Sequence, residues 1–481
     1  MVYEAFADVS PSHDPANVAF RFESDWYRVA DGESTTLLDE LLSTQDPQIS
    51  TILDSIIPLR VTTAEESQKV LTAYRLVAKR EVPARAKVFH VASVPVVLYP
   101  WEWTNTQLRA VAEFTLALRI QLLQVGLDLK DASAYNVQFV NGQPTLVDVG
   151  SLTYWDKRPG WCALRQFVEH FINPLAVGQL PNVCASDAWL LGGGNGLRSP
   201  TARDLLPFKA RLSLRLKLLH LATTSQKQNR SESNSLENAS ELSLSHCQRA
   251  AIRLTKNLAR LIRGFSSPRR VTTWNSYSDR SHYSASELAR KYELLRDFVA
   301  INAPNCETIL DIGSNDGATA RRLSDEFGCR VVAVDADIGA LELLEKSIEA
   351  SPRAKANITP VRADLLHSSF FESSFGSELR PLPERIVANI VVCEAVVHHL
   401  VITRGKPLSD VVRILRQFGP LLYLEVPTEE DEKVKQLIRQ IHNWKGEYSV
   451  ECLIRELRRN YNQVEILGRV NNSRLVISAH A

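Results

Sequence analysis

The sequence lacks features that would assign it at once to several protein classes. Its seven cysteines are odd in number, scattered and without a C-x-x-C pair, which argues against a disulfide framework or a cysteine-bound zinc. No apolar run approaches the ~18 residues that cross a bilayer, and the first residues show no basic region followed by an apolar one. The formal charge of +1 indicates no bulk attraction to nucleic acid. We therefore expect a cytoplasmic protein with reduced thiols, no bound metal and no nucleic-acid partner.

Length and composition are those of an ordinary globular chain. With 481 residues, 44% of them apolar and 23% charged, the sequence predicts two or three domains, each large enough for its own core. The clearest change in composition covers residues 223–246, where Ser, Asn, Glu and Gln replace apolar residues. Such a segment buries too little surface to offset its ordering entropy. It predicts a flexible linker over residues 223–250.

The region after this linker has the pattern of an α/β domain. Short runs rich in β-branched residues alternate with stretches of helical periodicity. This alternation predicts a doubly wound, mostly parallel sheet. The expected strands lie within residues 307–313, 329–337, 358–366, 385–395, 420–426 and 474–480.

The turn after the first of these strands reads LDIGSNDG, residues 310–317, with the spacing D-x-G-x-x-x-G. In an open α/β sheet this first strand-to-helix turn lies at the ligand site. A dinucleotide fingerprint, G-x-G-x-x-G, would place glycine at position 315, but Asn315 stands there. An acid at the strand end, Asp311, also disfavours a pyrophosphate. Asp311, Gly313, Asn315 and Gly317 therefore predict a site for a ligand without phosphate.

This turn resembles motif I of the class I S-adenosyl-L-methionine (SAM) methyltransferases, and the strands that follow keep to that pattern from about residue 274 onward. The resemblance implies a Rossmann-like sheet, with Asp335 on the ribose, Asp364 at the adenine amino group and Leu365 beside the ring. The fourth strand leads to Glu394 and to the pair His398 and His399. Taken alone, the two aspartates could equally be a loop acid and a helix cap, and a histidine here could be a core residue.

The fourth strand also bears on the methyl acceptor. It begins with Asn389, and no N-P-P-Y or D-P-P-Y segment follows, which disfavours methylation of an amide or of adenine. An oxygen or carbon acceptor is favoured, and methyl transfer then needs orientation of the reactants and, in some cases, a base. The candidate catalytic residues are His398, His399 and Glu425.

The first half carries a second pattern. Asp131 and Asn136 form D-x-x-x-x-N, an Asn-Gly turn follows at 141–142, and Asp148 comes after the predicted hairpin. This order resembles the catalytic lobe of kinases, in which such groups hold a metal ion and accept a proton. No phosphate loop precedes it, Lys79 is a weak candidate for the phosphate-pairing lysine, and GGGNG at 192–196 is better explained as a turn. Magnesium and ATP are therefore possible ligands, but we favour an inert polar cluster in which Asn136 bridges the two acids.

Both halves together resemble a bacterial family of SAM-dependent methyltransferases, some members of which are linked to nodulation and surface glycans. The resemblance rests on YPWEW at 99–103 and LKDASAYNVQ at 129–138. It implies an α+β kinase-like domain over residues 1–222 and a methyltransferase domain over residues 251–481, with a small-molecule, saccharide or lipid-linked acceptor.

Two alternatives stay open: a bifunctional kinase and methyltransferase, and a SAM-binding adaptor without activity. The basic stretch 208–221 could contact a membrane surface, although packing on its own domain is a simpler explanation. The sequence leaves the acceptor and the oligomeric state open.

Overall fold

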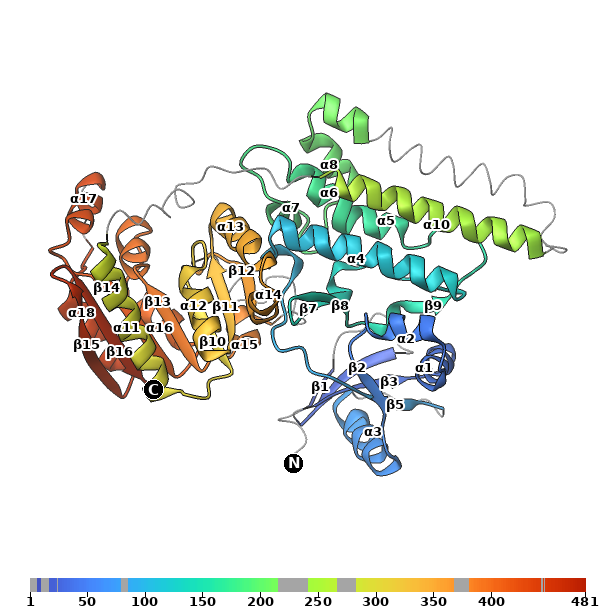
Figure 1. Cartoon of the computed structure of the whole chain (residues 1–481), viewed down its shortest axis with the longest axis horizontal. Coiled ribbons are helices and arrows are strands. Elements are labelled where there is room, and N and C mark those ends of the chain that lie inside the picture. The colour runs from blue at the N-terminus through green and yellow to red at the C-terminus, as the bar shows by residue number, and fades with distance from the viewer. Residues whose placement is uncertain are drawn as a thin grey trace. The chain divides into compact units, whose positions relative to one another are not determined.

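The computed structural model describes residues 7–9, 17–23, 25–78, 85–214, 241–265, 283–366, 380–442, 444 and 446–481 (Figure 1). By its contacts the chain divides into two compact units. The first contains Met1–Trp101 and Asn105–Ser267, and the second contains Glu102–Thr104 and Pro268–Ala481.

The first unit begins with an antiparallel sheet in the order β1-β2-β3-β5-β4. Helix α3 (Ala64–Ala78) packs on this sheet, and one apolar cluster joins them through Phe20, Val29 and Tyr74. Two further helices, α1 (Glu33–Ser43) and α2 (Pro47–Leu53), connect β3 to β4. The strands are β1 (Ala7–Val9), β2 (Asn17–Phe22), β3 (Asp25–Ala30), β4 (Leu59–Val61) and β5 (Lys87–Val91).

A predominantly helical part follows in the same unit, built around the buried helix α4 (Asn105–Gln124). The predicted hairpin is present: Asn141 (φ 49°) and Gly142 (φ 70°) join β7 to β8, and two successive positive φ angles are the requirement of a tight hairpin turn. The GGGNG segment is a turn after α7, as predicted. The remaining elements are β6 (Leu127–Leu129), η2 (Ala134–Asn136), β7 (Val137–Val140), β8 (Gln143–Leu146), η3 (Val149–Ser151), β9 (Leu152–Tyr154), α5 (Leu164–Phe167), η4 (Val168–Ile172), α6 (Asn173–Val177), α7 (Ala185–Leu191) and α8 (Ser199–Leu205).

Helix α10 (Glu241–Arg263) belongs to the first unit, because it packs along α4. The two helices are tied by Arg119, which is fully buried, donates to Thr255 Oγ1 at 2.6 Å and forms two hydrogen bonds to Asp128. The division between the units therefore falls after Ser267, later than the predicted boundary at residue 250. Residues 223–240 of the predicted linker lie outside the described residues.

The basic stretch after α8 is only partly packed on its own unit. Leu214 packs against the apolar cluster that contains Ala202 and Leu206, whereas the side chain of Phe208 is 66% exposed and that of Leu212 is 44% exposed. Packing on its own domain therefore does not account for the whole segment, and residues 215–221 lie outside the described residues. Among the described helices, none is both long and apolar enough to cross a membrane.

The second unit contains a seven-stranded sheet in the order β12-β11-β10-β13-β14-β16-β15. The first five strands pair in parallel, and β16 runs antiparallel to both of its neighbours. All six predicted runs contain strands, but β15 was not predicted, because most of its side chains are partly or fully exposed. The strands are β10 (Thr308–Ile312), β11 (Arg330–Asp335), β12 (Ile358–Arg362), β13 (Ile390–Glu394), β14 (Leu421–Pro427), β15 (Gln463–Asn471) and β16 (Arg474–His480).

Helix α11 (Ala285–Asn302) packs against the sheet of this unit and starts at a recognisable cap. It begins with a capping box between Ser284 and Glu287, and its apolar side chains join the core formed with β10, β11, β13 and β14. Strand β11 is buried along most of its length, which is typical of a central parallel strand. The other helices are α12 (Ala318–Phe327), α13 (Ile338–Glu349), α14 (Pro352–Asn357), α15 (Leu382–Arg385), η7 (His399–Thr403), α16 (Leu408–Arg416), α17 (Glu432–Gln440) and α18 (Val450–Asn460).

Candidate functional site

The turn between β10 and α12 is shaped by its glycines. Gly313 and Gly317 both have φ of 72°, a conformation that side chains rarely adopt. A Cβ atom on Gly313 would lie 2.2 Å from Cγ2 of Val396, and one on Gly317 would lie 2.3 Å from Cδ1 of Leu344. Backbone conformation and packing therefore account for both glycines, so these residues alone do not demonstrate a ligand.

Asp335 at the end of β11 holds this turn in place. Its Oδ2 accepts a hydrogen bond from the backbone N–H of Asn315 at 2.9 Å, and its Oδ1 accepts one from the N–H of Asp337 at 2.8 Å. Burial raises the pKa of Asp335, while these backbone donors lower it. The structure thus brings together Asn315 and Asp335, two residues that the sequence predicted for one site.

Asp364 and Leu365 follow β12. The Oδ1 atom of Asp364 accepts from the N–H of Leu366 at 3.0 Å, and its Oδ2 lies 2.8 Å from Nη2 of Arg404. Leu365 is buried. The local hydrogen bond fits the simpler interpretation of Asp364 as a turn acid, so its contact with an adenine ring stays a prediction.

Three acids lie on one face of the sheet. Asp311 is in register with Val392, and Glu394 is in register with Glu425. Because side chains alternate between the faces of a strand, Asp311, Glu394 and Glu425 point the same way. Burial and the nearby carboxylate of Glu394 raise the pKa of Asp311 well above its usual value. This face therefore concentrates acidic side chains at the strand ends.

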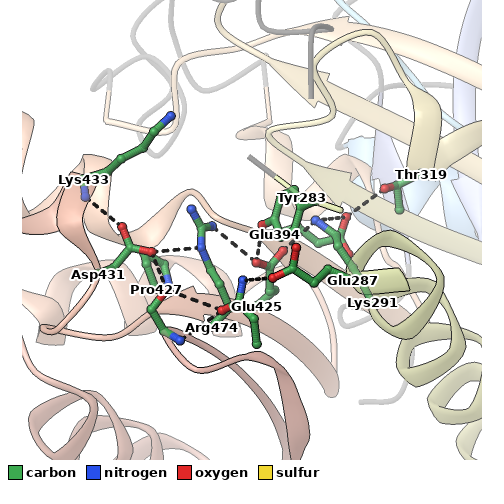
Figure 2. Close-up of polar contacts among 12 residues, drawn as sticks. Tyr283, Glu287, Lys291, Thr319, Glu394, Glu425, Pro427, Asp431, Lys433 and Arg474 are labelled. Carbon is green, nitrogen blue, oxygen red and sulfur yellow. Dashed lines mark hydrogen bonds and ion pairs between the residues drawn. The ribbon is translucent and has the colours of Figure 1, made fainter. Parts of the chain in front are cut away.

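The positive charges that compensate these acids were not predicted. Lys291 of α11 places its Nζ 2.6 Å from Oε2 of Glu425 and 3.3 Å from Oε2 of Glu394 (Figure 2). Arg474 of β16 lies 3.3 Å from Oε1 of Glu425, to which Tyr283 also donates its hydroxyl at 2.6 Å. The only signal in the sequence was indirect: two glutamates at the ends of buried strands need cations.

This network disfavours the predicted role of Glu425 as a general base, and that role stays a prediction. Its side chain is fully buried, and both carboxylate oxygens already accept hydrogen bonds. Although burial by itself would raise the pKa of Glu425, Lys291 and Arg474 hold it below the usual value. An ionised carboxylate bound in this way has little tendency to take up a proton.

His398 and His399 lie just beyond β13, with ring centroids 4.0 Å apart. Burial lowers the pKa of His399 to about 4 and that of His398 well below its usual value, so both imidazoles are neutral at pH 7. His398 Nδ1 is buried and, among the described residues, has no hydrogen-bond partner. The chain enters this segment through Ala395, whose φ of 56° is rare for a residue with a side chain.

Several buried polar atoms at the ends of β10 and β13 have no hydrogen-bond partner within the described parts of the chain. Three of them are acceptors: Asp311 Oδ2, Asn315 Oδ1 and Glu394 Oε1. Ser314 Oγ and His398 Nδ1 add to the group. A buried acceptor without a donor costs about 1–3 kcal/mol. Their concentration at one edge of the sheet indicates a site for a ligand that donates hydrogen bonds or carries positive charge.

The pattern predicted in the first unit is brought together in part, and both of its acids have partners within the unit. Asp131 Oδ1 accepts from the N–H of Ser133 at 2.8 Å, and Asp131 and Asn136 line the same small cavity. The carboxylate of Asp148 lies 2.6 Å from Nη2 of Arg28 on β3. Asn136 Nδ2 has no partner among the described atoms, so the predicted bridge between the two acids is not formed. Lys79 lies outside the described residues.

Comparison with known proteins provides one relative. No protein-family model matches the chain. The nodulation protein NoeA of Rhizobium meliloti (strain 1021) is 26% identical over 371 residues, which cover 76% of this chain and 76% of that protein. The chain is a relative of NoeA. This bears out the predicted link to nodulation proteins.

Three solved structures show more remote similarity. Monomeric WbdD matches 44% of this chain and 45% of its own at 13% identity and a TM-score of 0.31, so the match spans less than half of WbdD. The N-terminal domain of EvdMO1 with SAH bound matches 42% of this chain and 83% of its own at 15% identity and a TM-score of 0.30. Magnesium protoporphyrin IX methyltransferase (ChlM) from Synechocystis PCC 6803 with bound SAH matches 44% of this chain and 88% of its own at 12% identity and a TM-score of 0.29. Scores of this size do not by themselves define a fold or an activity.

Proposed function

We propose that the second unit is a class I SAM-dependent methyltransferase. The observation that carries the proposal is the group of buried acceptors at the ends of β10 and β13, which lack donors among the described residues. SAM carries an ammonium group and a sulfonium, both positive, and the latter activates its methyl group for transfer. The strand order β12-β11-β10-β13-β14 supports the proposal, since it is the 3-2-1-4-5 order of doubly wound sheets that bind nucleotides at this edge.

In this proposal, different residues around this edge would bind different parts of the cofactor. The turn from Gly313 to Gly317 would take the methionine end, close to Asp311, and Asp335 would accept from the ribose hydroxyls. Asp335 retains capacity for this role, because each carboxylate oxygen accepts more than one hydrogen bond. Asp364 and Leu365 would meet the adenine ring.

The test of this placement is the affinity of the full chain for SAM, measured by calorimetry. Asp335→Ala removes two charge-assisted hydrogen bonds of roughly 1.5–3 kcal/mol each, so we expect SAM affinity to fall at least tenfold. Because Asp335 also holds the N–H of Asn315, circular dichroism must show that the variant is folded. A folded Asp335→Ala protein with unchanged SAM affinity would contradict the placement of the ribose on Asp335.

For the chemistry, we propose transfer to an oxygen of a small molecule or glycan. The kinship with a nodulation protein supports a saccharide acceptor. With Glu425 held in its ion pairs, His398 is the better candidate for the base, because its buried Nδ1 has no partner among the described atoms. Its low pKa makes it a weak base, suited to accepting a proton only as the methyl group is transferred.

Replacement of His398 by Gln should reduce turnover by ~10²–10⁴, the usual loss when a general base is removed, while SAM affinity stays the same. Turnover is measured by mass spectrometry of candidate saccharides incubated with SAM. His399→Gln serves as the matched control on the neighbouring ring. Full turnover in both variants would mean that the acceptor needs no protein base. A wild-type protein that binds SAM and methylates nothing would favour the alternative of an adaptor.

A further inference from the structure

Lys291 lies between two glutamates that are register partners on adjacent parallel strands. Its Nζ is 2.6 Å from Oε2 of Glu425 and 3.3 Å from Oε2 of Glu394. The side chain of Lys291 is 17% exposed, that of Glu425 is 0% exposed and that of Glu394 is 9% exposed. Two carboxylates side by side in a buried setting repel each other strongly. Lys291 is therefore the charge that offsets the repulsion between Glu394 and Glu425.

The two carboxylate oxygens of Glu394 have different surroundings. Oε2 lies near Nζ of Lys291 and accepts a hydrogen bond from Oγ1 of Thr319 at 2.7 Å (Figure 2). Oε1 is buried and lacks a partner among the described atoms. Two donors on one oxygen fix the orientation of the carboxylate, so the direction in which Oε1 points is determined by Lys291 and Thr319. Oε1 is therefore an acceptor with a fixed direction that receives no hydrogen bond from the described atoms.

The charge around Oε1 selects the ligand group that it would accept from. Asp311 on the neighbouring strand β10 adds a second buried acceptor, its Oδ2, which has no partner among the described atoms. Asp311 is in register with Val392, two residues before Glu394, so the two carboxyls stand on the same face of adjacent strands. Two acidic acceptors disfavour a ligand carboxylate and favour a group with several N–H donors and a positive charge. Within SAM, the α-ammonium group has that chemistry.

We propose that Lys291 and Thr319 are positioning residues that aim Glu394 Oε1 at the α-ammonium group of SAM. This inference rests on the proposed function. Lys291 does not touch the cofactor in this arrangement; it acts through Glu394. The competing role is direct contact between Lys291 and the cofactor carboxylate, which would require its short contact with Glu425 to break.

Ligands that carry different parts of SAM separate these roles. Calorimetry on the full chain compares SAM, decarboxylated SAM, which keeps the ammonium group, and 5′-methylthioadenosine, which lacks both ammonium and carboxylate. Lys291→Met should weaken SAM and decarboxylated SAM at least tenfold and change the affinity for 5′-methylthioadenosine less than twofold. Lys291→Arg should restore most of the loss. Arg290→Met, on the same helix but in an exposed pair with Glu293, is the matched control.

Each contrary result has a distinct meaning. If Lys291→Met loses as much affinity for 5′-methylthioadenosine as for SAM, Lys291 only supports the fold. If the variant loses affinity for SAM but not for decarboxylated SAM, Lys291 contacts the cofactor carboxylate directly. Both results would overturn the inference, as would unchanged affinities. Since Lys291→Met leaves Glu425 with fewer cations, Thr319→Val gives an independent check that removes only the hydroxyl on Oε2. It should weaken the two ammonium ligands about threefold or more and leave 5′-methylthioadenosine unchanged. If the wild type binds none of the ligands, the proposed function fails instead.

Discussion

The two units carry acid-rich patterns that look alike in sequence and differ in how their polar atoms are satisfied. In the first unit, Asp131 accepts from a backbone N–H and Asp148 is paired with Arg28. In the second unit, Asp311 and Glu394 are buried with carboxylate oxygens that lack donors within the described residues. Acids that receive their donors from the chain stabilise the chain. Acids with oxygens that lack such donors remain able to accept hydrogen bonds from a ligand, and this contrast supports the ligand site that we propose for the second unit.

The largest effect should come from breaking the buried network in the second unit. Glu425→Ala removes the buried carboxylate that pairs with both Lys291 and Arg474, and such a change costs about 3–5 kcal/mol. The measurement is urea denaturation, with hydrogen exchange to show that protection is lost in β13 and β14. Glu65→Ala breaks an exposed pair with Lys69 in the first unit and should lower stability far less, because solvent screens such a pair. Equal losses of folding stability in Glu425→Ala and Glu65→Ala would contradict the conclusion that the buried network stabilises the second unit.

A second prediction compares two aspartates whose replacement by asparagine should change folding stability in opposite directions. Asp148→Asn removes an ion pair and should lower stability by about 1 kcal/mol. Asp311→Asn removes a buried acid whose pKa is raised in the folded state, so it should raise the stability of the ligand-free protein and lower SAM affinity. A gain of ~1 kcal/mol corresponds to roughly 2–4 °C in Tm for a unit of this size.

The pH dependence of that gain follows from the direction of the pKa shift. Between its ordinary value and the raised value, the folded protein keeps a proton on Asp311 that the unfolded chain has lost. Folding stability from this group therefore falls as pH rises through that window. Thermal unfolding at several pH values should show the difference between Asp311→Asn and wild type growing from about pH 4 upward. A constant difference, or a loss of stability in Asp311→Asn, would contradict the account of this site.

The smallest expected effect is that of Mg²⁺ and ATP on the first unit. With Arg28 on Asp148 and no recognisable phosphate loop in the sequence, we expect no thermal stabilisation of the full chain by Mg²⁺ and ATP. Differential scanning fluorimetry is sufficient to test this. Stabilisation that disappears in Asp148→Ala would show that the first unit binds nucleotide, and the comparison between the units would then have to be reversed.

Much of the second unit could be predicted from sequence because its signals are local. The runs of β-branched residues in β10 to β14 and the glycines at 313 and 317 depend on backbone conformation and on burial over a few residues. Strand β15 was missed because its exposed side chains lack the apolar pattern. The boundary near residue 250 was misplaced because α10 has a polar start, while its place in the first unit depends on a partner, α4, more than a hundred residues earlier.

The sequence by itself determined which acids stand at the strand ends, since position after a strand is a property of the chain order. Only the tertiary structure decided which of those acids have donors. Lys291, Arg474 and Tyr283 come from other elements, and nothing in their own neighbourhoods marks them as partners of Glu425. Hydrogen bonding and desolvation depend on distances between residues far apart in sequence, so the same kind of acid became a structural group at Asp148, while Oδ2 of Asp311 has no partner among the described residues.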